Sequence, residues 1–91
     1  MTHAIVLIEA ERDAMSTLGS QVAEVEGVAE SYSVTGAWDF VAIVRVRAHE
    51  QLADVVQTGI GGLAGVVKTQ TMVAFEAFSR HDLEALFAVG E

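Results

Sequence analysis

One short segment, Gly36-Ala37-Trp38-Asp39, combines residue types that can hold a charged ligand. Gly36 accepts a positive φ, which allows successive backbone N–H groups to point the same way and bind an anion. Asp39 adds a carboxylate nearby, so the segment offers partners for both charges of a zwitterion. The same residues also suit a tight turn, in which Asp39 bonds local backbone N–H groups and Trp38 covers the rim. These four residues are therefore compatible with a ligand-binding loop and with a purely structural turn.

The other chemically capable side chains lack the spacing of a catalytic or metal centre. The three histidines, at a strand start, a helix start and the tail, are His3, His49 and His81. Their scatter predicts no metal site, and the sequence shows no nucleophile–base pair, phosphate loop or carboxylate dyad, so we expect neither an enzyme nor a cofactor. Arg45 and Arg47 alternate along one strand and are expected to pair with acids such as Glu9. Anchoring a ligand carboxylate is the alternative role for these arginines.

Composition restricts the partners and the compartment. Of the 91 residues, 52% are hydrophobic, and the formal net charge is −8. This charge disfavours direct binding to nucleic acid, because it repels the phosphate backbone. No stretch approaches the roughly 20 apolar residues of a membrane span. The absence of cysteine and of a signal-peptide core predicts a cytoplasmic protein, and the surplus of apolar residues predicts a protein partner that covers them.

An internal repeat organises the chain, because residues 4–46 are echoed by residues 42–84. Within it, Gly27-Val28 corresponds to Gly65-Val66. A repeated unit of this size cannot bury its apolar face alone, so the two copies should share one core. The segment Gly36–Asp39 falls opposite ordinary strand residues in the second copy, and it is therefore the place where we expect function.

Hydrophobic periodicity predicts two strand–helix–strand units. Residues 4–10 and 40–46 are apolar on both alternating faces and read as central strands. The first helix is expected to follow Asp13 as its N-cap and to stop at Gly27. The second helix, with Leu52 on its apolar side, should fray early because glycines follow it. The remaining strands are expected over residues 28–35 and 66–78.

Two such units sharing one antiparallel sheet make a ferredoxin-like α+β sandwich, βαββαβ, over residues 1–78. Both helices then cover one face of the four-stranded sheet, and the other face stays open although it is apolar. We therefore expect a homodimer that buries the open face against its copy, as in a dimeric α+β barrel. The rival cover is a C-terminal short helix and tail over residues 79–91, where Ser79 and Asp82 resemble a capping box. The apolar residues of this helix are Leu83, Leu86 and Phe87.

An ordered set of motifs resembles the effector-binding domain of the Lrp/AsnC family of regulators, the RAM (regulation of amino acid metabolism) domain. The motifs are Gly27-Val28, Thr35-Gly36-Ala37-Trp38-Asp39, the apolar strand 40–46, Gly65-Val66 and Thr69-Gln70-Thr71. The resemblance spans about residues 2–78. It implies dimers formed through the sheet faces, their assembly into a higher oligomer such as an octamer-like ring, and an amino-acid effector held between neighbouring dimers.

The resemblance also implies the residues of the ligand site. The segment Gly36–Asp39 matches the family's effector loop, whose backbone amides and acid meet the carboxylate and the ammonium of the ligand. Thr69 and Thr71 match paired threonines of the last strand that complete the pocket, and their hydroxyls both donate and accept. Without the family, β-propensity on a half-buried strand accounts for these threonines. Tyr32 and Ser33 are further candidates, because their strand position places them near the loop.

Two departures from the family pattern affect the expected function. Members usually carry a winged-helix DNA-binding domain before this module, whereas only Met1-Thr2-His3 precede the first expected strand. The chain is therefore expected to be a stand-alone form that does not read DNA by itself. Trp38 also stands where a tyrosine is commoner, which replaces a phenolic O–H by a larger ring with one N–H donor.

Three hypotheses for the function follow. The first is a stand-alone ligand-sensing and oligomerisation module that binds an amino acid or related metabolite between subunits and mixes with full-length Lrp/AsnC-type regulators of transcription. The second is a small dimeric α+β-barrel enzyme of the monooxygenase or isomerase type, which would place polar catalytic groups between sheet and helices. The third is a structural assembly partner that binds no ligand.

Overall fold

The computed structural model describes residues 1–78, and the helix expected within residues 79–91 lies outside the described residues. The elements, in chain order, are β1 (Thr2–Ala10), η1 (Arg12–Ala14), α1 (Leu18–Ala23), β2 (Val28–Ser33), β3 (Phe40–Val46), α2 (Gln51–Ala53), η2 (Asp54–Ile60) and β4 (Val66–Val73). The expected βαββαβ order is confirmed. The last strand ends at Val73, well short of the predicted Phe78, although the N–H of Ala74 still donates to the carbonyl of His3 at 2.9 Å.

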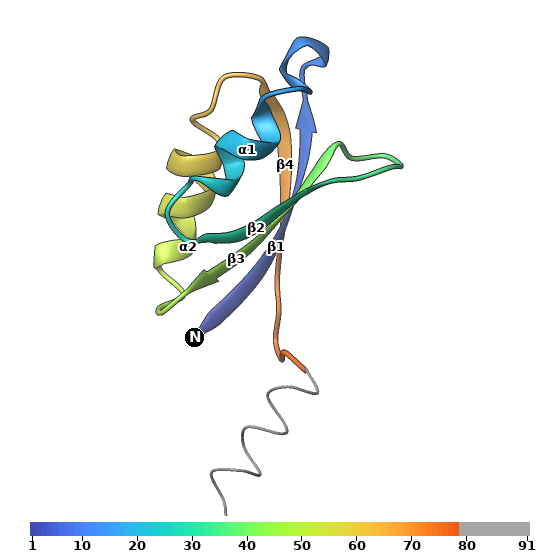
Figure 1. Ribbon diagram of the computed structural model, residues 1–91. Helices are drawn as coiled ribbons and strands as arrows, with labels where there is room; N and C mark the ends of the chain where they lie inside the picture. The colour runs from blue at the N-terminus through green and yellow to red at the C-terminus, as the bar shows by residue number, and fades with distance from the viewer. Residues whose placement is uncertain (79–91) are drawn as a thin grey trace, which may run out of the picture.

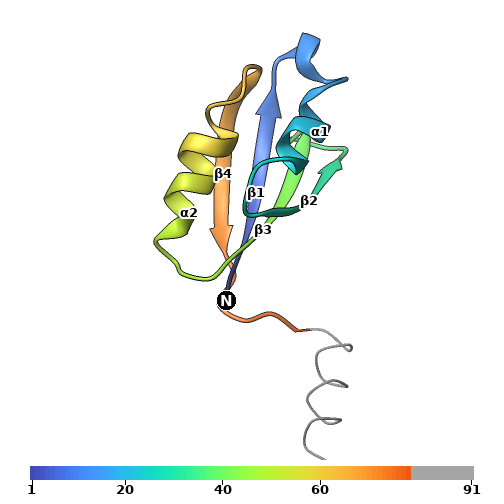
Figure 2. The ribbon, with the colours of Figure 1, turned by 60° about the vertical axis from the view of Figure 1, so that its left-hand side comes forward.

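The four strands form one antiparallel sheet in the order β2-β3-β1-β4. β1 is therefore central, with Ile5 opposite Ile43 of β3 on one side and opposite Met72 of β4 on the other. Both helical segments lie on the same side of this sheet, and within residues 1–78 its other side carries no element (Figure 1; Figure 2). This arrangement confirms the ferredoxin-like α+β fold expected from the repeat.

The core lies between the sheet and the helices. Alternate residues of β1 and β3 point toward the helices, because successive side chains of a strand face opposite sides. The buried residues are Ala4, Val6, Ile8, Leu18, Val22, Phe40, Ala42, Val44, Val46, Leu52, Val55 and Ile60. Among the described residues every buried side chain is apolar, so dispersion and the hydrophobic effect hold the two layers together.

The repeat is visible in the backbone. β2 begins at Val28 and β4 at the equivalent Val66, and each is preceded by a glycine with φ of +98°, Gly27 and Gly65. A Cβ atom on Gly27 would lie 2.6 Å from Cγ2 of Val55. The Gly-Val pairs therefore mark the two places where a chain leaving the helix layer turns tightly into an edge strand.

The two helical segments depart from the predictions. Asp13 does not cap a helix: it lies inside the short 3₁₀ turn η1, and α1 begins only at Leu18. The N–H of Ala14 donates to the carbonyl of Glu11 at 3.0 Å, so the turn begins before Asp13 and encloses it. The N–H of Glu11 donates to the carbonyl of Gly65 at 2.7 Å and ties the exit of β1 to the start of β4. Met15, which lies between η1 and α1, is 39% exposed.

The second helix passes through Gly59 and ends at Ile60, directly before Gly61. After Ala53 it widens into the π-helical segment η2, and the N–H of Gly61 still donates to the carbonyl of Val56 at 2.8 Å. A Cβ atom on Gly59 would lie only 2.5 Å from Cγ1 of Val25. Gly59 therefore permits the close approach of this helix to the end of the first one, instead of ending it.

The open sheet face is apolar at its centre. Ile5, Leu7, Val41 and Ile43 alternate with the core residues of β1 and β3 and are only half-buried. At the two edges of the sheet, Tyr32 of β2 is 48% exposed and Met72 of β4 is 43% exposed. This pattern is the one expected of a face that needs a cover. Within residues 1–78 no helix is long and apolar enough to cross a membrane.

We expect Gly59→Ala to destabilise the protein, although alanine is the better helix former. The new methyl group would overlap Val25, and overpacking of this kind costs about 1–3 kcal/mol. Urea unfolding followed by circular dichroism would measure the change. In a Val25→Ala background the same substitution should be neutral or stabilising. A Gly59→Ala protein as stable as the parent would contradict the close helix approach.

Candidate functional site

The connection between β2 and β3 contains Gly36 with φ of +107°, a value that L side chains rarely adopt. A Cβ atom built on Gly36 would have no other atom within 4 Å. The glycine is therefore required by the backbone conformation and not by crowding. The space around it is open, so the loop presents its backbone to solvent.

Asp39 has a structural role at the end of this loop. Its Oδ2 accepts a hydrogen bond of 2.8 Å from the backbone N–H of Ala10 at the end of β1. Its own N–H donates to the carbonyl of Ile8 at 2.9 Å, and its carbonyl accepts from the N–H of Val34 at 3.0 Å. The turn interpretation is thus correct in part, although the bonded N–H belongs to a neighbouring strand. This bond uses one of the two carboxylate oxygens.

Through the side chain of Trp38, the loop contacts Lys68 of β4. The ammonium of Lys68 lies 5.6 Å from the centroid of the indole ring, within the range of a cation–π contact. Lys68 sits opposite Glu9 in the register of β4 with β1. Lys68 has no motif that marks it in the sequence, because only the register of an edge strand places it beside the loop.

Thr69 and Thr71 stand on the other side of β4 from Lys68. They lie opposite Ile8 and Val6, which are buried under the helices, and directly opposed residues share a face of the sheet. Because β4 is an edge strand, Thr69 is half-buried and Thr71 is exposed. The loop and the threonines therefore meet at the same edge of the sheet from opposite faces.

Tyr32 lies far from these threonines within one protomer. It is on β2, the opposite edge strand, and two strands separate it from β4, a span of roughly 14 Å at ~4.8 Å per strand. Its hydroxyl donates to a carboxylate oxygen of Glu30, whose other oxygen is 3.7 Å from Nη2 of Arg45. Ser33 is exposed opposite Phe40, next to the start of the loop.

Arg45 and Arg47 do not pair as predicted. Arg45 contacts Glu30 and lies opposite His3 at the start of β1, whereas Glu9 is near the other end of that strand. The predicted partner Glu9 is therefore wrong, because the antiparallel register of β1 and β3 separates the two groups.

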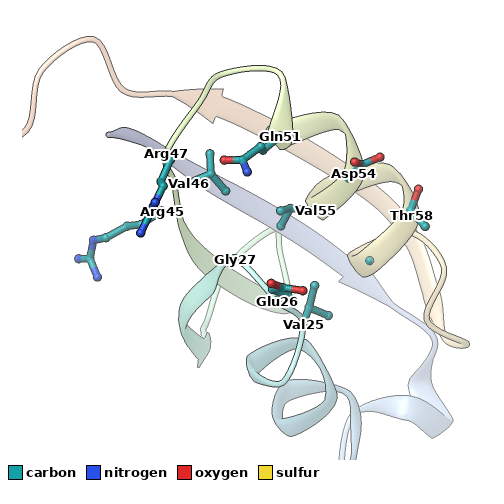
Figure 3. A pocket seen from close by; sticks show the side chains of 11 residues that line it. Val25, Glu26, Gly27, Arg45, Val46, Arg47, Gln51, Asp54, Val55 and Thr58 are labelled. Atoms are coloured by element: carbon teal, nitrogen blue, oxygen red, sulfur yellow. The ribbon is translucent and has the colours of Figure 1, made fainter.

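A shallow groove of about 600 Å³ lies at the end of β3 that is farther from the loop. Val25, Val46 and Val55 supply apolar surface, and Figure 3 shows Val55 of the helix facing the connection that carries Glu26. The remaining lining residues are Glu26, Gly27, Arg45, Arg47, Gln51, Asp54, Thr58 and Gly59. β3 spans roughly 20 Å at ~3.3 Å per residue, so this groove and the loop are separate candidate sites.

Comparison with protein families identifies the domain. The family model described as the Lrp/AsnC ligand binding domain matches residues 3–83. The chain belongs to this family. The loop Gly36–Asp39 and the threonine pair thus lie within the region that the family model matches. Among curated proteins, no sequence matches this one significantly.

Solved structures share the fold. TTHA0845 from Thermus thermophilus is 48% identical, with a TM-score of 0.82, and the match covers 88% of this chain and 100% of that one. The feast or famine regulatory protein from M. tuberculosis complexed with L-methionine is 26% identical, with a TM-score of 0.71 over 87% of this chain and 53% of that one. E. coli AsnC is 17% identical, with a TM-score of 0.79 over 87% of this chain and 54% of that one, which shows the fold alone.

The contact between Tyr32 and Glu30 predicts a measurable shift. The hydrogen bond to Glu30, followed by the charge of that carboxylate, raises the pKa of Tyr32 above its ordinary value of 10.0. Because the pKa in the folded protein is the higher one, the contribution to stability is fully present below about pH 10 and is lost as the pH rises through the folded pKa.

We therefore expect Glu30→Gln to lower the pKa of Tyr32 toward its ordinary value. Tyr32 is the single tyrosine of the chain, so tyrosinate absorbance reports on it alone. Glu9→Gln, near the far end of β1, is the matched control and should leave the titration unchanged. An unchanged curve in Glu30→Gln would show that the two side chains do not interact in solution.

Proposed function

We propose that this chain is a ligand-sensing and oligomerisation module that binds an amino acid or a related metabolite and modulates Lrp/AsnC-type regulators of transcription in the cytoplasm. The family match over residues 3–83 is the observation that carries the proposal. The complex of the feast or famine regulatory protein with L-methionine supports the ligand class. The open surroundings of Gly36 leave room for such a ligand at the loop.

The proposed site combines parts of more than one subunit. In one protomer Tyr32 lies on the edge strand opposite to the one that carries Thr69 and Thr71, and the loop contacts the face of β4 that these threonines do not share. A pocket that uses all of these residues requires surfaces of neighbouring copies to meet. We therefore propose that the effector binds between subunits of an octamer-like ring, where its binding energy shifts the population of assembled states.

The ligand proposal predicts a thermal shift. With the twenty amino acids tested singly, at least one should raise the melting temperature of the parent protein, since a ligand that binds only the folded state stabilises it. Asp39→Asn should reduce this shift, because it keeps an acceptor for the N–H of Ala10 and removes the charge that faces a ligand ammonium. Asp39→Ala is less informative, since it also removes that hydrogen bond.

Asp54→Asn is the matched control, because Asp54 is an exposed aspartate that lines the distant groove. If Asp54→Asn abolished the thermal shift while Asp39→Asn kept it, the ligand would belong to the groove. If no amino acid stabilised the parent protein, the proposal of an amino-acid effector would be wrong.

The assembly proposal depends on the open sheet face. We propose that two copies pack through Ile5, Leu7, Val41 and Ile43, because these four apolar residues are adjacent on the uncovered side and half-buried in the single chain. An apolar area of this kind is typical of a symmetric dimer interface.

Leu7→Asp should therefore dissociate the dimer, while Thr71→Asp, which adds the same charge to the helix-covered side of β4, should not. Size-exclusion chromatography with light scattering would measure the mass, and circular dichroism would confirm that both variants fold. A parent protein that is monomeric at micromolar concentration would contradict the proposed interface.

A further inference from the structure

Lys68 reaches the loop from another strand. Its ammonium is 5.6 Å from the centroid of the Trp38 ring, so the side chain extends from β4 past the end of β1 toward the β2–β3 connection. The Lys68 side chain is exposed and Trp38 is half-buried. The indole therefore provides a fixed surface over which a flexible cation is held.

Lys68 contacts Trp38 although a potential ion-pair partner, Glu9, is its neighbour on β1. Glu9 lies directly opposite Lys68 in the register of β1 and β4. Among residues 1–78, however, the ion pair formed is that of Arg45 with Glu30, and Lys68 forms none. The ammonium faces a ring that accepts no conventional hydrogen bond, so its three N–H donors are available to a ligand.

The loop needs a positive charge if it is to hold a carboxylate. Asp39 is the charged residue of the loop and is negative, and the whole chain has a formal charge of −8. Backbone N–H groups near Gly36 supply only partial charges. A carboxylate placed there without a cation would be repelled by its surroundings, and Lys68 is the cation that the fold brings to this position.

We propose that Lys68 binds the carboxylate of the effector and that Trp38 positions the Lys68 ammonium for this contact. The inference rests on the proposed ligand-sensing function and specifies its chemistry: the site takes ligands with a free carboxylate and discriminates against their amides. The ammonium of an amino acid would face Asp39, whose second carboxylate oxygen is not used by the bond to Ala10.

Trp38 is the single tryptophan of the chain, so its fluorescence reports on this site alone. The titration uses the twenty L-amino acids and their α-carboxamides as probes. The variants are Lys68→Met, which removes the charge, Lys68→Arg, which keeps it, and Arg47→Gln. Arg47 is an exposed cation just beyond the far end of β3 and lines the separate groove, so Arg47→Gln controls for the loss of one charge and tests that groove as the alternative site.

The parent protein should prefer an amino acid over its amide. Lys68→Met should weaken binding of that amino acid by about ten-fold or more, as expected for the loss of a hydrogen bond between charged groups, and should remove the preference over the amide. Lys68→Arg should retain most of the affinity, and Arg47→Gln should behave as the parent. Without ligand, Lys68→Met should also change the Trp38 emission, since the cation leaves the ring.

The possible failures are distinguishable. If the parent protein bound none of the probes, the proposed amino-acid effector and the role of Lys68 would both be wrong. If the parent bound an amino acid and Lys68→Met bound it equally well, only the role of Lys68 would be wrong. Equal affinity of the parent for the amino acid and its amide would also overturn the carboxylate contact. Urea unfolding of each variant verifies that a loss of binding is not a loss of folding.

Discussion

Val6 and Ile8 of β1 and Ala42 and Val44 of β3 are fully buried beneath the helices, and this contact decides where the other elements lie. The small side chain of Ala42 allows close packing in the middle of the layer, while the branched residues fill the space on either side. Because both copies of the repeat supply one central strand, neither half has a complete core without the other. The edge strands and the loop between the copies are held in place by this shared layer.

The same contact creates the open face. A strand that buries alternate residues on one side must direct the remaining ones to the other side, and in the middle of β1 and β3 those residues are also aliphatic. The sheet therefore has a second apolar face, which no other element of residues 1–78 covers. The loop Gly36–Asp39 lies at the end of this sheet, where the covered and the open face meet. A site at that position can respond to assembly, since its surroundings change when a second copy arrives.

The sequence predicted those features that depend on local pattern. Short runs that are apolar on both faces predicted β1 and β3, the Gly-Val pairs predicted the starts of β2 and β4, and the loop sequence predicted a positive φ at Gly36. Features that depend on pairing between distant segments could not be predicted from local sequence patterns. Arg45 meets Glu30 instead of Glu9, and Lys68 meets Trp38, because strand register decides which charges come together. Asp13 has the residue type of an N-cap, but the 3₁₀ turn that begins at Glu11 encloses it.

The carboxylate of Asp39 closes the end of β1 in place of a backbone carbonyl. Its position coincides with the irregularity at Glu9 and Ala10, where the pairing of β1 with β4 shifts register. A hydrogen bond to a side chain breaks by rotation about the two side-chain bonds of Asp39 alone, so no strand has to separate from its neighbour. Rotamer changes at partly exposed positions take picoseconds to nanoseconds, whereas unzipping of a strand belongs to slower local unfolding. The loop can therefore exchange Ala10 for another hydrogen-bond donor while the sheet beneath it stays intact.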